Sequence, residues 1–376
     1  MNKKKIVFLT GTRADFGKLK PLINIIENSE NFDCYIFVTG MHTLSKYGST
    51  FTEIKKLGYK HIFIYMNQTN TTESDIILAN TVTGFSNFIK EIRPDMIVLH
   101  GDRIETLAGA ITGSFNNILV SHIEGGELSG TIDELIRHAV SKLSHIHFVS
   151  NDEAKKRVIQ MGESEKSIFV IGSPDIDIMY GNDLPSMDEV KSHYDIPYDD
   201  YAPFIFHPIT TEISTLEHQI KEVVTALVES KKNYVIIYPN NDPGCDVILK
   251  EYELLKNMKN FKILPSLRFE YFLTLLKNSK FLIGNSSTGI KESGVYGIPT
   301  INIGTRQKNR TKNSDIININ SEKNQILTAI KVVEHKKVEK CSHFGDGKSS
   351  QRFFDIVSDP KTWEISIQKQ FIDLDN

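Results

Sequence analysis

Short apolar runs alternate along the chain with longer segments whose apolar residues recur at helical spacing. In the first half of the sequence these runs occupy residues 6–10, 34–39, 96–100, 118–124, 146–150 and 168–172. Between the first two runs, one face of a helix would carry Leu19, Leu22, Ile23 and Ile26. Such alternation is typical of βα units, so the pattern predicts a doubly wound domain with a parallel sheet.

The stretch 175–203 interrupts this pattern, because it is rich in Pro, Asp and Tyr and poor in aliphatic runs. We interpret it as a helix plus a linker. A second series of apolar runs then covers 204–207, 234–238, 262–264, 280–284 and 300–303. A chain of 376 residues is also longer than one hydrophobic core usually organises, since cores tend to split beyond ~250–300 residues.

The sequence therefore predicts an α/β protein with two Rossmann-type domains, at 1–175 and 176–358, whose parallel sheets face a central cleft. The last segment, 359–376, has an amphipathic pattern that contains the sole tryptophan. We expect this segment to be a helix that packs back on the N-terminal domain. Its apolar positions are Trp363, Ile365, Ile367 and Phe371.

The composition is that of an ordinary globular protein, with 40% hydrophobic and 24% charged residues. A formal net charge of -3 provides no broad basic surface, so we expect neither nucleic acid nor an anionic membrane as a partner. The first apolar run is too short for a signal peptide, and no stretch approaches the ~20 apolar residues of a membrane span. The cysteines fit a reducing cytoplasm, because none has the spacing of a metal or redox site: Cys34, Cys245 and Cys341.

Ligands of open α/β sheets bind beyond the carboxyl ends of the strands, so the residues just after each apolar run are the informative ones. After the first run comes a turn flanked by Gly11 and Gly17 that carries Arg13. Its backbone N–H groups and the arginine can hold an anion at the start of the next helix. An ordinary turn with a solvated arginine is the alternative interpretation.

Three carboxylates follow in the same half. Asp102 lies in a Gly-Asp-Arg turn beside Arg103, Glu124 ends a strand before two glycines, and Asp133 lies in the following helix. Clustered carboxylates can have their pKa values pushed apart, which yields one general base and one general acid. We therefore predict a catalytic role for all three, while a helix cap is the alternative for Asp102. No HExxH motif or cysteine set supports a metal site.

The second half offers an acid and a phosphate-binding turn. His207 follows an apolar run in Phe-His-Pro, where it could protonate a departing phosphate near neutral pH, although a lone histidine is often structural. Ser286 and Ser287 follow another run, and small hydroxyl residues at a helix start can donate to a phosphate. Glu292 lies just inside that helix and could accept the ribose hydroxyls, and Arg306 could neutralise a diphosphate.

Other basic and amide side chains near the same strand ends are weaker candidates. Asn241 lies in an Asn-Asn-Asp-Pro-Gly turn, and Arg268 precedes an aromatic-rich helical segment. Both are predicted to lie near the nucleotide pocket. Lys308 and Arg310 are interpreted as solvated.

Several strings in order along the chain resemble the hydrolysing UDP-N-acetylglucosamine 2-epimerases of sialic acid synthesis. They are GTRADFG, VTGMH, HGDR, HIEGGE, DELIRH, FHP, GNSSTGIKE and GTRQ. The chain is also similar to the epimerase half of the animal bifunctional epimerase/kinase. This resemblance covers nearly the whole chain and implies a GT-B-like fold, with the active site between two Rossmann-type domains.

The resemblance also implies how the substrate is bound. It implies that UDP lies mainly on the second domain, with Ser286 and Ser287 at the phosphates and Glu292 at the ribose. Arg13 and Arg306 correspond to arginines that contact the diphosphate. The predicted substrate-binding set is completed by Lys18, Arg103, Asn241 and Arg268.

The implied reaction removes the C2 proton, eliminates UDP to give 2-acetamidoglucal, and adds water with inversion at C2. It requires a base, an acid and an anion clamp, but no cofactor. Asp102, Glu124 and Asp133 match the family's carboxylate positions and His207 the histidine near the leaving group, with base and acid unassigned. Homodimers or dimers of dimers are common in the family.

Four other functions remain open from the sequence. A related epimerase acting on UDP-2,4-diacetamido-2,4,6-trideoxy-glucose would differ only in its C4 and C6 pocket, and a non-hydrolysing 2-epimerase resembles the chain less closely. A GT-B glycosyltransferase could use the same UDP clamp, but a simple transferase would not need the carboxylate cluster. A non-catalytic UDP-sugar sensor would bind the substrate and leave it intact.

Overall fold

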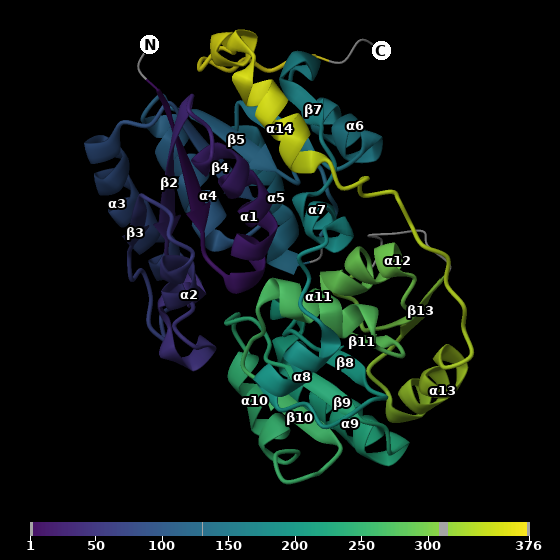
Figure 1. Cartoon of the computed structure of the whole chain (residues 1–376). Helices are drawn as coiled ribbons and strands as arrows, with labels where there is room; N and C mark the ends of the chain where they lie inside the picture. The colour runs from purple at the N-terminus through teal and green to yellow at the C-terminus, as the bar shows by residue number, and fades with distance from the viewer. Residues whose placement is uncertain (1–2, 130, 308–314, 374–376) are drawn as a thin grey trace. The chain divides into compact units, whose positions relative to one another are not determined.

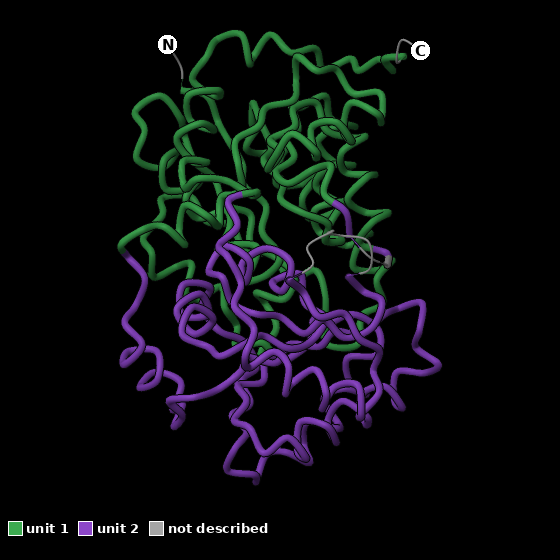
Figure 2. Tube along the Cα trace, turned by 90° about the vertical axis from the view of Figure 1, so that its right-hand side faces the viewer, with its two compact units in different colours: residues 1–127, 133–182, 343–376 green, residues 128–132, 183–342 purple. Residues whose placement is uncertain are grey.

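The computed structural model describes residues 3–129, 131–307 and 315–373, and the chain divides into two units (Figures 1 and 2). Unit 1 comprises residues 1–127, 133–182 and 343–376, and unit 2 comprises residues 128–132 and 183–342. Each unit has its own parallel β-sheet. The prediction of two Rossmann-type α/β domains is therefore confirmed.

The sheet of unit 1 has the order β3-β2-β1-β4-β5-β6-β7, and its neighbouring strands pair in parallel. This is the doubly wound order, in which the direction of winding reverses between β1 and β4. Its strands are β1 (Lys4–Thr10), β2 (Phe32–Val38), β3 (Ile62–Ile64), β4 (Met96–His100), β5 (Leu119–Ile123), β6 (Ile146–Val149) and β7 (Ile168–Val170).

Helices cover both faces of this sheet because successive side chains of each strand point to opposite faces. Ile6 and Phe8 of β1 pack in one core cluster with α1 and α14, while Val7 and Leu9 pack in another with α3, α4 and α5. The helices of unit 1 are α1 (Arg13–Glu27), α2 (Phe51–Lys56), α3 (Ser74–Ile92), α4 (Ile104–Phe115), α5 (Thr131–Leu143), α6 (Asp152–Gln160), α7 (Pro174–Tyr180) and α14 (Ser349–Ser358).

The sheet of unit 2 has the order β10-β9-β8-β11-β12-β13 and is also parallel. Its strands are β8 (Ala202–Ile205), β9 (Tyr234–Ile237), β10 (Phe261–Leu264), β11 (Leu282–Gly284), β12 (Thr300–Ile303) and β13 (Ile316–Ile319). Its helices are α8 (Met187–Tyr194), α9 (Ile213–Ser230), α10 (Cys245–Glu253), α11 (Phe269–Lys277), α12 (Glu292–Tyr296) and α13 (Lys323–Val333).

The boundaries of the units differ from the predicted domains, because α7 and α14 both belong to unit 1 rather than to the segment 176–358. Phe353 and Val357 of α14 are fully buried in the core beside β1. The carboxylate of Asp177 in α7 accepts the backbone N–H groups of Ser349 and Ser350, at 2.8 and 2.7 Å. Asp177 therefore satisfies two donors at the start of α14, which the spacing in the sequence does not reveal.

The amphipathic helix predicted for 359–376 does not form in the described part of that segment. A 3₁₀ turn, η6 (Pro360–Glu364), is followed by residues 365–373 without helix. The Lys369 ammonium donates to the carbonyl oxygens of Lys142 and Ser144, and the Ile372 N–H donates to Gly162. These bonds attach the segment to the rest of unit 1.

Candidate functional site

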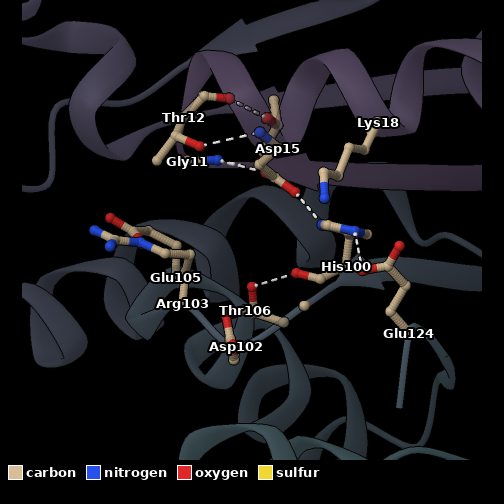
Figure 3. A network of polar contacts seen from close by, with 12 residues as sticks. Gly11, Thr12, Asp15, Lys18, His100, Asp102, Arg103, Glu105, Thr106 and Glu124 are labelled. Carbon is tan, nitrogen blue, oxygen red and sulfur yellow. Dashed lines mark hydrogen bonds and ion pairs between the residues drawn. The ribbon is translucent and has the colours of Figure 1, made fainter. Parts of the chain in front are cut away.

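The carboxyl ends of β1, β4 and β5 bring the predicted residues of unit 1 to one edge of its sheet. The Thr12 side chain accepts the Asp15 N–H at 3.1 Å and begins α1, and the Asp15 carboxylate accepts the Gly11 N–H at 3.1 Å. His100 is the last residue of β4, and Glu124 directly follows β5. Figure 3 shows Asp15, His100 and Glu124 in a row, with Lys18 beside them.

His100 lies between two carboxylates and is only 8% exposed. Its Nδ1 lies 2.9 Å from Asp15 Oδ1, and its Nε2 lies 3.3 Å from Glu124 Oε2. Burial by itself lowers the pKa of a histidine, but the charges and hydrogen bonds of Glu124 and Asp15 outweigh it and raise the pKa of His100 to about 9. The imidazole is therefore protonated near neutral pH.

Glu124 is held by backbone as well as side-chain bonds. Its φ of 63° lies in the left-handed region, which costs on the order of 1–3 kcal/mol for a residue with a side chain. Its N–H donates to Phe148 at 2.9 Å, and its carboxylate accepts the Ser173 hydroxyl. The surrounding structure thus maintains a strained turn that fixes the direction of this carboxylate.

Arg137 of α5 is the cation around which the predicted carboxylates gather. Its guanidinium donates to Asp102 and, at 2.7 Å, to the Glu124 carbonyl oxygen, and the residue is 4% exposed. Burial lowers the pKa of this guanidinium, but the charges of Asp102, Glu124, Glu127 and Asp133 outweigh it and raise the pKa. The structure therefore brings together all three predicted catalytic carboxylates of unit 1.

The three predicted substrate-binding cations of unit 1 each contact a carboxylate of the same unit. Arg13 Nε lies 3.1 Å from Glu53 Oε2, and Lys18 Nζ lies 3.4 Å from Oδ2 of the fully buried Asp175. Arg103 Nε lies 3.9 Å from Glu105 Oε2, and Figure 3 shows this pair on the side of the site away from Lys18. Their contacts with phosphate remain predictions.

In unit 2, Asn285 fixes the backbone of His207. Its amide oxygen accepts the His207 N–H at 2.7 Å, and its amide nitrogen donates to the His207 carbonyl oxygen at 2.9 Å. Gly284, just before it, has a φ of 137°, and a Cβ there would lie 1.9 Å from the Ile205 carbonyl oxygen. The absence of a side chain at Gly284 lets β11 approach β8 closely enough for this clamp.

The proton of neutral His207 can be placed on one ring nitrogen. The Asn240 N–H donates to Nδ1 of His207 at 3.0 Å, so this nitrogen is an acceptor. A neutral imidazole has one acceptor and one donor nitrogen, which places the proton on Nε2. The neutral ring of His207, the predicted acid, therefore has a single donor atom, Nε2.

The predicted phosphate-binding turn follows the same strand end. Ser286 Oγ accepts the Thr288 N–H at 3.3 Å and begins the 3₁₀ helix η5 (Ser287–Gly289). Arg306 is 7% exposed, and its Nη1 donates to the Asn285 carbonyl oxygen at 3.4 Å. The turn therefore combines hydroxyl and N–H donors with a buried cation, the groups that bind phosphate.

The remaining predicted residues of unit 2 are placed as follows. Glu292, 2% exposed, is the first residue of α12, and Asn241 is half-buried in the segment after β9. The Arg268 guanidinium lies 5.5 Å from the centre of the Tyr271 ring, and the backbone N–H of Arg268 donates to the Tyr194 hydroxyl at 3.0 Å. Lys308 and Arg310 lie outside the described residues.

The sequence-based site omitted Asp15, His100, Arg137, Ser173 and Asn285. Two of these omissions had a visible signal, since His100 directly precedes the Gly-Asp-Arg turn and Arg137 lies one helical turn after Asp133. Among the residues described, no group of three or more His, Cys, Asp or Glu has an arrangement that could hold a metal ion. No described helix is long and apolar enough to cross a membrane.

The two parallel sheets, each with polar residues after its strands, define an α/β protein of the GT-B-like class. The sequence model of the UDP-N-acetylglucosamine 2-epimerases matches residues 24–358. The chain belongs to this family. A UDP-N-acetylglucosamine 2-epimerase of Neisseria meningitidis serogroup B is 47% identical over 376 residues, with 99% of each chain covered.

Two further relatives have informative names. The UDP-N,N'-diacetylbacillosamine 2-epimerase (hydrolyzing) of Legionella pneumophila is 34% identical and covers 94% of this chain and 95% of its own. The crystal structure of Methanocaldococcus jannaschii UDP-GlcNAc 2-epimerase in complex with UDP-GlcNAc and UDP has a TM-score of 0.78 at 24% identity. It covers 94% of this chain and 99% of that chain, and this likeness supports the fold.

Proposed function

We propose that this chain is a hydrolysing UDP-N-acetylglucosamine 2-epimerase, which converts UDP-N-acetylglucosamine and water to UDP and N-acetylmannosamine for sialic acid biosynthesis. The observation that carries this proposal is the cluster of Asp102, Glu124 and Asp133 around the buried Arg137. A protein that only binds or transfers a sugar would not need this cluster. The resemblance in sequence to the hydrolysing enzymes and the hydrolysing relative support the same reaction.

The first half of the reaction is an elimination. A carboxylate of the cluster takes the proton from C2, the C2–H electron pair forms the C1–C2 double bond, and the C1–O bond breaks with its electrons leaving on UDP. His207 donates the proton on Nε2 to the departing phosphate oxygen, which makes UDP a better leaving group. The products of this step are 2-acetamidoglucal and UDP.

The second half is the addition of water to the double bond. A carboxylate removes a proton from water as the water oxygen bonds to C1. An acid of the cluster delivers a proton to C2, on the face opposite to the one from which the first proton was removed. The sum of both halves consumes one water and releases UDP and N-acetylmannosamine. No redox or carbonyl chemistry is required, so a cofactor has no role in this scheme.

Unit 2 supplies the groups proposed to bind UDP. Ser286, Ser287 and Arg306 would contact the phosphates, and Glu292 would accept the ribose hydroxyls. These assignments are supported by the turn after β11, which offers hydroxyl and N–H donors of the kind that bind phosphate. The other proposed contacts to UDP or the sugar are Arg13, Lys18, Arg103, Asn241 and Arg268.

We also propose a cytoplasmic location, because Cys34, Cys245 and Cys341 are free thiols, and assembly as a homodimer or dimer of dimers, as the resemblance implies. The second candidate substrate is UDP-2,4-diacetamido-2,4,6-trideoxy-glucose. The relative in Legionella pneumophila, named for diacetylbacillosamine, favours this alternative. Its chemistry at C1 and C2 would be the same.

Chromatography of the products tests the proposal. The purified protein is incubated in parallel with UDP-N-acetylglucosamine and with the UDP-2,4-diacetamido sugar, and nucleotides and free sugars are quantified. We expect equal amounts of UDP and free N-acetylmannosamine from the first substrate, at a higher kcat/KM than from the second. UDP-N-acetylmannosamine as the product would instead indicate a non-hydrolysing epimerase, and unchanged substrates would refute the proposal.

A further inference from the structure

The ring of His100 lies between two carboxylates that themselves have fixed partners, with Nδ1 hydrogen-bonded to Asp15 and Nε2 at ion-pair distance from Glu124. Asp15 is 8% exposed and uses its second oxygen to accept the Gly11 N–H, while Glu124 is 7% exposed and uses its second oxygen to accept the Ser173 hydroxyl. A neutral imidazole donates from only one nitrogen. Two ionised carboxylates, 2.9 Å from Nδ1 and 3.3 Å from Nε2, favour the imidazolium, which carries a proton on both ring nitrogens.

The other ionisable groups around His100 are either paired with other carboxylates or neutral. Lys18 of α1 is paired with Asp175 of α7, and Arg137 of α5 with Asp102. His122 of β5 contacts the Gly101 carbonyl oxygen at 2.8 Å, and burial lowers its pKa to about 3, so it is neutral. The charges that act directly on His100 are therefore those of Asp15 and Glu124.

We propose that His100 is a positioning residue of the elimination step, an imidazolium between two carboxylates that keeps Glu124 ionised and oriented, so that Glu124 is the carboxylate that accepts the C2 proton. This inference rests on the proposed function. It assigns a base within the cluster, which the sequence left open. Asp15, which lies in α1, acts indirectly because it holds His100 in place.

The direct consequence is a change in the pH dependence of turnover. A cation beside a carboxylate favours its ionised form, typically by about 1–3 pH units. Replacing His100 by a neutral residue removes this effect, so the acidic limb of the kcat profile should move to a higher pH. A residue that merely supports the fold would lower activity without moving the acidic limb of the kcat profile.

The test compares His100→Gln with His122→Gln. Both replace a buried histidine by a neutral residue of similar length, but only the first removes a charge beside Glu124. For His100→Gln we expect kcat to fall about tenfold to a hundredfold with KM nearly unchanged, as expected for misplacing a reacting group. The acidic limb should move up by about one pH unit. In His122→Gln that limb should stay in place.

His100→Asn provides a second variant if His100→Gln does not fold. Its amide can still donate to Asp15, but it places no charge beside Glu124, so the same shift of the acidic limb is expected. A folded His100 variant whose acidic limb coincides with that of the wild-type protein would overturn the proposal. So would a shift of the same size in His122→Gln.

A measurement without substrate separates this proposal from the proposed function. The wild-type protein, labelled with ¹⁵N only in histidine, is titrated by NMR, and the His100 signals are assigned by their loss in a His100 variant. We expect both ring nitrogens to remain protonated up to about pH 8, below the pKa of about 9. A neutral ring at pH 7 would overturn the proposal, whereas a wild-type protein that releases no N-acetylmannosamine would refute the function.

Discussion

Asn285 bonds both backbone polar groups of His207, accepting its N–H at 2.7 Å and donating to its carbonyl oxygen at 2.9 Å. The two residues come from the ends of neighbouring strands, β8 and β11, and Asn285 is fully buried. The proposed acid is therefore positioned through its backbone, while Asn240 sets its tautomer. This clamp makes the placement of His207 depend on a residue that need not touch substrate.

Replacing Asn285 by Ala should lower both stability and turnover. The buried N–H and carbonyl oxygen of His207 lose their partner, which should cost about 2–4 kcal/mol of unfolding free energy. Urea unfolding followed by circular dichroism measures the loss. The control is Asn278→Ala, because Asn278 is exposed at the end of α11 and its loss should cost less than about 1 kcal/mol. Equal unfolding midpoints for both variants would contradict the clamp.

Replacing Gly284 by Ala should be more damaging than the same change at Gly48. Both glycines have a positive φ, 137° and 88°, but only at Gly284 would a Cβ meet backbone, at 1.9 Å from the Ile205 oxygen. Around Gly48 no atom lies within 4 Å, so strain of about 1 kcal/mol is expected there. We expect Gly284→Ala to cost more than about 4 kcal/mol or to prevent folding, as judged by thermal unfolding. Similar losses in the two variants would refute the close approach of β11 to β8.

Neutral variants of the clustered carboxylates should lose turnover and keep nucleotide binding. Asp102→Asn, Glu124→Gln and Asp133→Asn should each lower kcat by about 10²–10⁴, the usual contribution of a general acid or base. The dissociation constant for UDP, measured by calorimetry, should change less than about threefold, because no base or acid is needed to bind UDP. The control is Asp188→Asn, an exposed position of α8. Wild-type turnover in all three variants would refute the catalytic role assigned to these carboxylates.

Acid should weaken the attachment of the C-terminal tail through Glu163. Burial by itself raises the pKa of Glu163, but hydrogen bonds from His147, Lys142 and Lys369 outweigh it and lower the pKa to about 2. A carboxyl whose pKa is lowered on folding contributes stability above its unfolded value of about 4.5, and this contribution is lost as the pH falls towards 2. The stability difference between the wild type and Glu163→Gln should therefore shrink between pH 5 and pH 3.

Urea unfolding at several pH values measures this difference. Glu165→Gln serves as the control, since Glu165 pairs with Lys155 on the surface and its side chain is 68% exposed. That variant should show little effect at any pH, because exposed ion pairs contribute little. A difference for Glu163→Gln that stays constant from pH 7 to pH 3 would contradict the role of its charge.

Most of the described strands could be predicted from the sequence, because each coincides with one of the apolar runs. β4, for example, was predicted with its observed bounds, and its five residues are all buried. The edge strands β3 and β13 were missed, and part of each remains accessible, as at Phe63, which is 43% exposed. The place of α14 in unit 1 was also missed, since it depends on the contact of Asp177 with Ser349 and Ser350.

The candidate site was predictable where a residue lies within two positions of the end of a strand, as Asp102, Glu124, Ser286 and His207 do. Its supporting contacts were not, because they join residues far apart along the chain. His100 and Asp15 are separated by 85 residues, and His207 and Asn285 by 78. No local spacing connects such pairs, so only the fold shows that His100 and His207 are each held by a partner.

Proton NMR of the reaction in D2O tests the central claim most directly. The protein is incubated with UDP-N-acetylglucosamine, and the signals of UDP, N-acetylmannosamine and the sugar C2 proton are followed together. Elimination followed by hydration predicts free N-acetylmannosamine that carries deuterium at C2, formed in step with UDP. N-acetylmannosamine that retains its C2 proton, or UDP release without any N-acetylmannosamine, would contradict hydrolytic epimerisation by proton removal at C2.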